Sequence, residues 1–134
     1  MTLHLESRVE YVQLSDYCEI AAELLGDAPR KIEALPGIDR VEAALASPQA
    51  RFGEHDAYPT LIEKATVLID HLAQSRPLPD ANKRAALMTA WLFLERNGHP
   101  FKERTLDTDI SMVGRIAAGE TTIGEISLWL ERRT

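Results

Sequence analysis

The sequence predicts an all-α protein, a helical bundle around one buried central helix, with a short N-terminal strand or a hairpin as its only β structure. Apolar residues recur at helical spacing through most of the chain, and the frequent alanines favour helix. Residues 85–94 are apolar on nearly every side, and a helix that is hydrophobic all round is a buried one. The length of 134 residues, of which 45% are hydrophobic, suits a single domain over residues 1–134.

The N-terminal stretch predicts a strand and then a helix. Residues 1–8 show no clear period and are either loose or a short strand, and residues 9–13 alternate like a short edge strand. Ser15 or Asp16 is expected to cap the first helix, which Gly26 ends. The apolar positions of that helix fall at helical spacing: Tyr17, Ile20, Ala21, Leu24 and Leu25.

A polar connection and a turn precede the second predicted helix. Residues 27–31 form the connection, and residues 35–37, with the sequence Leu-Pro-Gly, form the turn. The helix follows from Ile38, and Pro48 stops it. Its buried positions are Ile38, Val41, Ala44 and Leu45.

Residues 49–59 form the longest irregular stretch, which is either a surface loop or a short hairpin. Thr60 then caps a strong helix that ends near Ser75, before Pro77. Its buried face is marked by Leu61, Ala65, Leu68, Ile69 and Leu72.

Three further helices are expected in the C-terminal half. The central one runs from Asn82 to Arg96, and the following Asn97-Gly98 pair suits a left-handed helix end. A next helix holds the apolar positions between 106 and 117, and Gly119 closes it. The last helix spans about residues 123–133, which brings the expected bundle to about six helices.

Composition excludes several classes of protein. Lys and Arg total 15 against 21 Asp and Glu, for a net charge of −6, which argues against direct nucleic-acid binding through a broad surface. Cys18 is the only cysteine, so an intramolecular disulfide is excluded and a cytoplasmic location fits. Neither a signal peptide nor a membrane span is expected.

The polar cluster in residues 76–84, with the sequence Arg-Pro-Leu-Pro-Asp-Ala-Asn-Lys-Arg, is the candidate functional site. It lies where a loop enters the N-terminal end of the central helix, and such an end binds anions through free N–H groups and its dipole. Lys83 and Arg84 oppose that dipole, at a cost of up to about 1 kcal/mol each, which a bound polyphosphate would offset. Asp80 is suited to Mg²⁺, and Asn82 to a phosphate oxygen.

Purely structural roles remain open for the same residues. Asp80 is also able to cap the helix or to pair with Lys83 or Arg84, and Asn82 is also able to act as the helix cap. Cys18, Trp91 and Trp129 are predicted to be core residues, because each falls in an apolar helical pattern.

Residues 76–84 resemble the signature motif of the Fic/Doc family, and the Asp-Ala-Asn-Lys-Arg form of residues 80–84 resembles its Doc (death-on-curing) toxin branch. The likeness extends to the Leu-Pro-Gly turn at 35–37, to the end of the central helix at 93–98, and to residues 118–120. It spans roughly residues 9 to 131. The resemblance implies a Fic/Doc-like helical bundle around a central buried helix.

The resemblance also implies a function. Doc-type toxins transfer phosphate from ATP to a threonine of elongation factor Tu and so block translation, whereas Fic members transfer AMP. By this likeness Asp80 holds Mg²⁺, while Asn82, Lys83 and Arg84 bind the phosphates with the helix N-terminus. The target would dock on a flap that contains four residues of the irregular stretch: Phe52, Gly53, Tyr58 and Thr60.

The resemblance implies a partner as well. A Phd-like antitoxin would fold its C-terminal segment as a helix into a groove of the toxin, and the acidic balance of this chain fits a basic segment. No membrane partner is expected.

Arg76 is the main departure from the family. The family's signature histidine is the general base that takes the proton of the attacking hydroxyl, and arginine stays protonated and cannot do so. Losing a general base typically lowers a rate by about 10²–10⁴-fold. Met88 is a second departure, since Doc proteins tend to carry a polar Asn there.

Three interpretations of Arg76 are open. The chain is a natural member that binds without turnover, a variant that has lost toxicity, or an enzyme with another base. His71 is the nearest histidine, and His55 and His99 are weaker candidates. The histidines show no zinc-ligand spacing. Phosphate transfer is preferred to AMP transfer because Lys83 stands where the Fic branch has a small Gly, and the rival class is a non-catalytic binding module.

Overall fold

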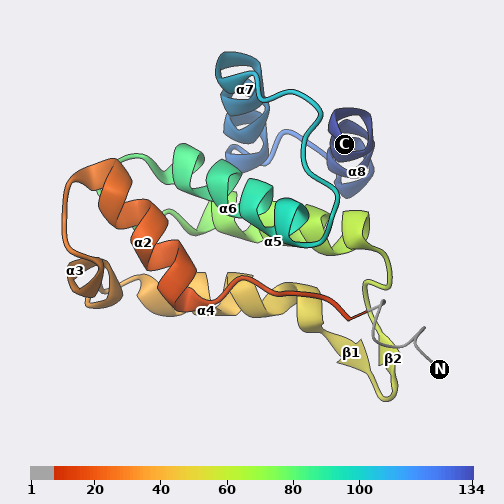
Figure 1. The fold of residues 1–134 in the computed structure, drawn as a ribbon, viewed down its shortest axis with the longest axis horizontal. Coiled ribbons are helices and arrows are strands. Elements are labelled where there is room, and N and C mark those ends of the chain that lie inside the picture. The colour runs from red at the N-terminus through yellow and green to blue at the C-terminus, as the bar shows by residue number, and fades with distance from the viewer. Residues whose placement is uncertain (1–7) are drawn as a thin grey trace.

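A computed structural model describes residues 8–134 of the chain, and the regular secondary structure of this part is helical except for one short hairpin (Figure 1). The predicted all-α bundle is confirmed. The elements in chain order are α2 (Leu14–Leu25), α3 (Pro29–Glu33), α4 (Ile38–Ala46), the 3₁₀ helix η1 (Ser47–Gln49), β1 (Arg51–Phe52), β2 (His55–Asp56), α5 (Leu61–Ser75), α6 (Asn82–Arg96), α7 (Leu106–Ala117) and α8 (Ile123–Arg133).

Helices α5 and α6 form the centre of the bundle. Figure 1 shows them side by side, with α4 on one side of α5 and with α7 and α8 on the other. Residues 85–94 of α6 are buried or half-buried throughout, which confirms the prediction of a buried central helix. Helix α5 shares this position, because it contacts α4, α6, α7 and α8. The polar motif of residues 76–84 lies in the loop between these two central helices and in the first turn of α6.

The predicted edge strand over residues 9–13 is wrong. The segment is extended but pairs with no strand of the described chain. Instead the Asn97 side chain holds it: the Glu10 N–H donates to Asn97 Oδ1 at 2.9 Å, and Asn97 Nδ2 donates to the Glu10 carbonyl at 2.9 Å. Residues 1–7, for which a loose segment or a short strand is predicted, lie outside the described part.

Helix α2 begins earlier than predicted. Its N-cap is Gln13, and Asp16 stands in the first turn, where its Oδ2 accepts from the Gln13 N–H at 2.8 Å. Neither Ser15 nor Asp16 is therefore the cap. Gly26 closes the helix in the left-handed conformation, with φ of 71°, as predicted.

The connection predicted over residues 27–31 contains the start of a short helix, α3. Pro29 stands in its first turn, where the fixed φ of proline favours helix. Ile32 anchors this helix, since its side chain is only 2% exposed. Five residues are too few to show a helical period in the sequence.

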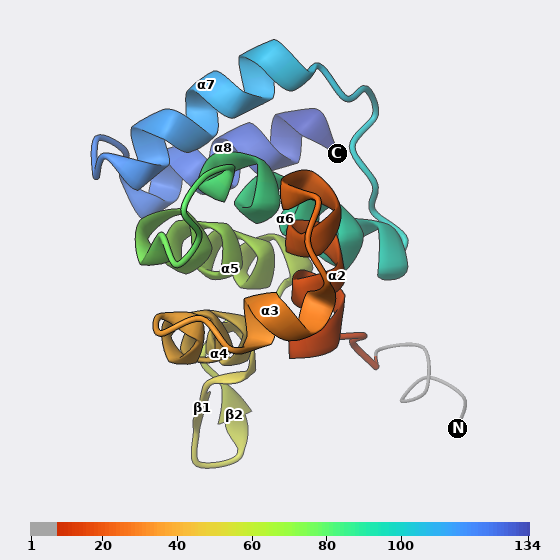
Figure 2. The same cartoon turned by 90° about the vertical axis from the view of Figure 1, so that its left-hand side faces the viewer.

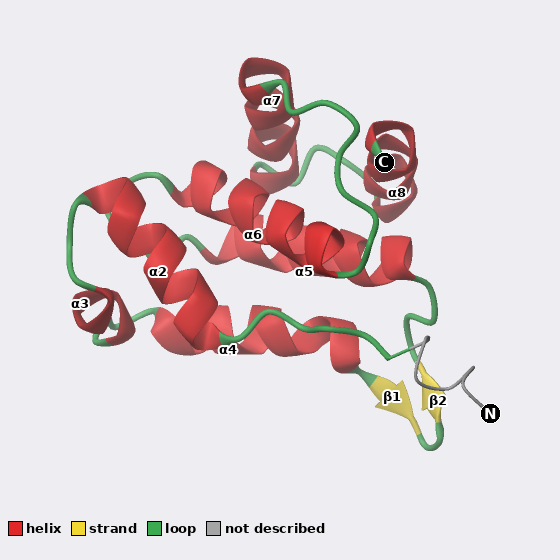
Figure 3. Ribbon diagram, in the orientation of Figure 1, coloured by secondary structure: helices red, strands yellow, loops and turns green. Residues whose placement is uncertain are grey.

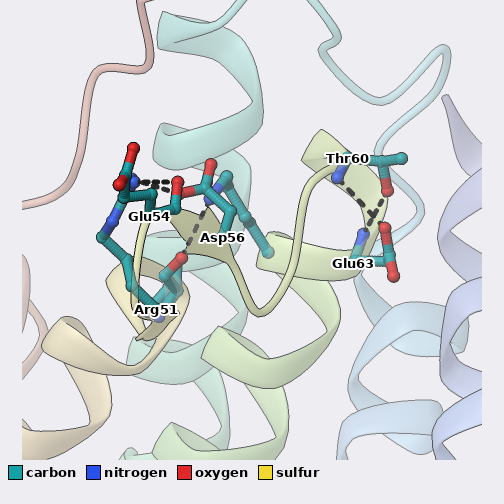
Figure 4. Close-up of polar contacts among 7 residues, drawn as sticks. Arg51, Glu54, Asp56, Thr60 and Glu63 are labelled. Atoms are coloured by element: carbon teal, nitrogen blue, oxygen red, sulfur yellow. Dashed lines mark hydrogen bonds and ion pairs between the residues drawn. The ribbon is translucent and has the colours of Figure 1, made fainter.

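Residues 49–59, for which either a surface loop or a short hairpin is predicted, contain a hairpin. Strands β1 and β2 pair antiparallel, with Phe52 opposite His55, and Gly53 turns the chain at a φ of 64° (Figure 3). Thr60 caps α5 as predicted: Glu63 N–H donates to its Oγ1 at 3.1 Å, and Glu63 Oε1 accepts from the Thr60 N–H at 3.0 Å (Figure 4).

The predicted core role of Cys18 is confirmed, whereas Trp91 and Trp129 are half-buried and pack against the core. Trp91 and Trp129 pack edge-on against Phe101, with ring centroids 6.0 and 5.7 Å apart. Cys18 is buried, and this burial, with a smaller contribution from nearby Glu33, raises the pKa of its thiol. No described helix is long and apolar enough to cross a membrane.

Candidate functional site

A cavity of about 650 Å³ opens at the N-terminal end of α6. All five charged or amide side chains of the motif line it: Arg76, Asp80, Asn82, Lys83 and Arg84. Pro79 and Ala81 of the loop, Ala73 of α5, and Ile110, Gly114 and Ala117 of α7 complete the lining. Figure 2 shows the loop between α5 and α6, with α7 running above it. The structure thus brings the motif together around one hollow.

The loop that carries the motif is held in an unusual backbone conformation. Arg76 has a φ of 43° and Ala81 a φ of 65°, and within residues 8–134 these are the two non-glycine residues with positive φ. Such conformations cost roughly 1–3 kcal/mol and persist where the surrounding structure enforces them, commonly at functional sites. The two strained residues bracket the loop.

Asn82 holds this loop from the first position of α6. Its Nδ2 donates to the Leu78 carbonyl at 2.8 Å, and its Oδ1 accepts from the Leu78 N–H at 3.0 Å. Asn82 is therefore not the helix cap, which is Ala81. Phosphate binding through Asn82 stays a prediction. One of its two Nδ2 hydrogens donates to Leu78, and the second is available for a phosphate oxygen.

The start of α6 offers free N–H groups to the cavity. No side chain caps the helix, and the first N–H with a backbone partner at this end is that of Ala85, which donates to the Ala81 carbonyl at 2.9 Å. Asp80 Oδ1 accepts from the Ala81 N–H at 2.8 Å. The N-terminal end of the dipole is thus open towards the cavity.

Lys83 and Arg84 form no ion pair with a described residue. The structural alternative, in which Asp80 neutralises them, is therefore not what the described chain shows. Lys83 lies along α7, since a Cβ added to Gly114 would sit 3.7 Å from its Cδ and 3.9 Å from its Nζ. Two exposed cations stand at a helix end that disfavours them, which is the arrangement an anion stabilises.

Arg76 points to the far wall of the cavity. Its Nη2 donates to the Ala117 carbonyl at 2.9 Å, in the last turn of α7. A cation at a helix C-terminus is favourable, and the bond satisfies a carbonyl that lacks an intrahelical partner. The Arg76 side chain thus links the end of α5 to the end of α7.

None of the described histidines lines the cavity. His71 is exposed on α5, and His55 and His99 are exposed elsewhere. Residues 8–134 also contain no group of three or more histidine, cysteine or carboxylate side chains placed to hold a metal. A metal at this site would have Asp80 as its one carboxylate ligand from the cavity lining.

The structure does not bring the predicted target-docking residues to the cavity. Phe52, Gly53, Tyr58 and Thr60 precede α5, whereas the motif loop follows it. The 15 residues of α5 place these ends roughly 20 Å apart along its axis. Phe52 is 76% exposed at the hairpin. None of these four residues lines the cavity, and target docking at this hairpin stays a prediction.

Two cations outside the motif hold opposite ends of α5, Arg40 at its C-terminal end and Lys64 near its start. Arg40 of α4 donates from Nε to the Ser75 carbonyl at 3.1 Å, directly before the motif loop. Lys64 of α5 is only 1% exposed. Lys64 had a signal in the sequence, a lysine inside an apolar helical face, whereas Arg40 had none, because its partner lies 35 residues away.

Comparison with known proteins identifies the family of this chain. The model of the Fic/DOC family matches residues 11–94, which include the hairpin, the motif loop and most of α6. A curated relative, "Toxin Doc" of Mycolicibacterium smegmatis, is 48% identical over 58 residues, which are 43% of this chain and 45% of the relative. The alignment thus spans less than half of that protein. With the family match over most of its length and the family's motif lining one cavity, the chain belongs to the Fic/DOC family.

Proposed function

We propose that this chain is a Doc-like toxin of a toxin–antitoxin pair, whose site transfers phosphate from ATP to a hydroxyl side chain of a translation factor such as elongation factor Tu. We further propose that Arg76 impairs this transfer. The observation that carries the proposal is the gathering of the five polar motif residues around one cavity at the uncapped end of α6. The likeness to a protein named "Toxin Doc" supports the toxin class.

The residues of the cavity suit a nucleoside triphosphate with Mg²⁺. Arg76, Lys83 and Arg84 supply positive charge, and the open N–H groups of α6 add donors. Mg²⁺ is usually bound in proteins by one or two carboxylates together with substrate phosphates, and Asp80 offers one. The ion would neutralise charge on the phosphate oxygens. A volume of about 650 Å³ lies in the range of small-molecule sites.

The transfer needs a proton acceptor that residue 76 does not supply. The target's hydroxyl oxygen forms a bond to the γ-phosphorus, the bond from that phosphorus to the bridging oxygen breaks, and ADP leaves. The hydroxyl proton must pass to a base. Arg76 is a donor only, and its guanidinium already bonds the Ala117 carbonyl. An imidazole in its place would accept the proton.

The Arg76 contact also supports a second candidate, a binding module without turnover. An arginine that bridges α5 and α7 stabilises the cavity wall while leaving the phosphate-binding groups in place. The two candidates differ in what a base at residue 76 would do.

Arg76→His is the test. We expect it to produce growth inhibition on expression and phosphate transfer to elongation factor Tu. Arg76→Gln is the matched control, because it also removes the guanidinium but supplies no strong base, and it should stay inactive. If Arg76→His is as harmless as the parent and neither protein binds ATP, the enzyme proposal is wrong. ATP binding by both without transfer would favour the binding module. An AMP adduct, distinguished by the mass of the modified target, would indicate the Fic-type reaction.

We propose a Phd-like antitoxin as the partner, with a basic C-terminal helix that complements the net charge of −6. Co-expression of the reading frame next to this one should suppress the toxicity of Arg76→His, and the two proteins should purify as a complex. Toxicity that the neighbouring protein does not relieve would count against this pairing.

A further inference from the structure

The C-terminal end of α5 lacks the backbone bonds that usually close a helix. Its cap, Arg76, has the left-handed conformation, but it is not a glycine and has no capping backbone bond of its own. Helix α5 therefore ends in carbonyls that need donors from elsewhere, immediately before the loop that lines the cavity. Ser75 Oγ supplies one, to the Leu72 carbonyl at 2.8 Å.

Arg40 supplies another donor from a different helix. Its Nε donates to the Ser75 carbonyl at 3.1 Å, and its positive charge stands at the negative end of the α5 dipole. No acidic side chain of the described residues pairs with Arg40. Within the described residues, the one side-chain hydrogen bond of Arg40 goes to the carbonyl of Ser75, the residue before Arg76.

Gly37 makes room for this contact. A Cβ on Gly37 would lie 2.6 Å from Arg40 Nη2, which is closer than real Cβ contacts, and 3.1 Å from its Cζ, so the flexible end of the Arg40 side chain would have to move. The same Cβ would lie 3.4 Å from the Cα of Pro77, so the Leu-Pro-Gly turn packs directly against the motif loop. The guanidinium thus occupies the space left by the missing side chain, between α4 and the loop.

We propose that Arg40 is a positioning residue for the cavity: it holds the end of α5, and with it the strained loop of residues 76–81, in the conformation that presents the cations and the free N–H groups of α6. Gly37 supports this contact, because its missing side chain leaves room for the Arg40 guanidinium. The consequence for ligand affinity rests on the proposed nucleotide-binding function. The consequence for loop conformation does not.

Two readouts test the proposal on the full chain. Isothermal titration calorimetry with ATP and Mg²⁺ measures the affinity of the cavity for the nucleotide. The rate of amide hydrogen exchange at Leu78, whose N–H donates to Asn82 Oδ1, measures how often the loop opens. Arg40→Met keeps the aliphatic stem but no donor. We expect it to weaken ATP binding about tenfold and to speed exchange at Leu78 by a similar factor, as expected for losing one charge-assisted hydrogen bond. Exchange at His99, bonded to the Leu94 carbonyl in another part of the fold, should not change.

Further variants separate positioning from general stability. Arg40→Lys should recover part of both effects, and Gly37→Ala should reproduce them by displacing the guanidinium. The double variant should be no worse than Arg40→Met alone. Arg30→Met, on the exposed face of α3, is the matched control and should leave both readouts within twofold. If Arg40→Met matches that control at Leu78, or only lowers the melting temperature, the inference is wrong. If neither the parent nor Arg76→His binds ATP, the proposed function fails, and the Leu78 result still decides the role of Arg40.

Discussion

Asp56→Ala is expected to destabilise the protein through Lys64, a lysine whose side chain is only 1% exposed. Lys64 Nζ donates to the Pro48 carbonyl at 3.0 Å, lies 3.5 Å from Asp56 Oδ2, and sits over the Tyr11 ring at 5.6 Å. It therefore holds the residues before β1 and the end of β2, which are the two legs of the hairpin. Arg51 Nη1 donates to the other carboxylate oxygen of Asp56, Oδ1, at 2.7 Å. Figure 4 shows both residues at the hairpin.

The expected loss in the free energy of unfolding is about 2 kcal/mol. Breaking a fully buried ion pair costs roughly 3–5 kcal/mol, because it leaves an uncompensated charge. Asp56 is 38% exposed, so water takes over part of its role, and the cost falls towards the roughly 1–3 kcal/mol of an unsatisfied buried group. For a chain of this length, about 2 kcal/mol corresponds to a melting temperature roughly 8 °C lower.

Urea denaturation of single and double variants provides the assay. Lys64→Met removes the buried charge and keeps the aliphatic stem, so Lys64→Met combined with Asp56→Ala should be more stable than Asp56→Ala alone. Arg51→Ala is the control for the other partner of Asp56; this pair is largely exposed and should contribute less than about 1 kcal/mol. The reasoning would be refuted if the losses in free energy of unfolding caused by Asp56→Ala and Lys64→Met simply added in the double variant. It would also be refuted if Asp56→Ala lost no more stability than Arg51→Ala.

Two other changes test the wall of the cavity and the contact between α2 and α6. Gly114→Ala should raise the free energy of unfolding by about 0.5–1 kcal/mol, since alanine favours helix and the added Cβ meets Lys83 only at van der Waals distance; a loss in thermal denaturation would contradict this. Asp16 accepts two hydrogen bonds from Arg96, at 2.8 and 2.9 Å, and this contact is the main reason why the pKa of Asp16 is lowered. The stabilisation by Asp16 is therefore complete at pH values above the pKa of an unfolded aspartate, about 3.9, and is lost as the pH falls through the lower pKa of the folded state. The stability difference between the parent and Asp16→Asn, measured by urea denaturation, should accordingly shrink below about pH 4, and a difference that is constant with pH would rule out this linkage.

Most helices could be predicted because their signals are local. Helix α6 begins and ends at the residues that the apolar run and the Asn97-Gly98 pair indicate, and α5 follows the Thr60 cap. Helix α3 was missed because five residues, stabilised by Pro29 and one buried Ile32, carry no period. The segment over residues 9–13 alternates like a strand, yet its backbone partner is a side chain, Asn97, 87 residues away.

The candidate site divides in the same way. The gathering of its polar side chains could be predicted from nine consecutive residues, because a loop that enters a helix N-terminus places its polar side chains together. The sequence alone also shows that residue 76 is an arginine, whose side chain stays protonated and cannot accept a proton. Its contacts could not be predicted, because the partners of Arg76 and Arg40 lie 41 and 35 residues away and are brought near only when α4, α5 and α7 pack. Periodicity and capping report neighbours within about one helical turn, whereas the packing of distant helices aims the guanidinium of Arg76 at the Ala117 carbonyl.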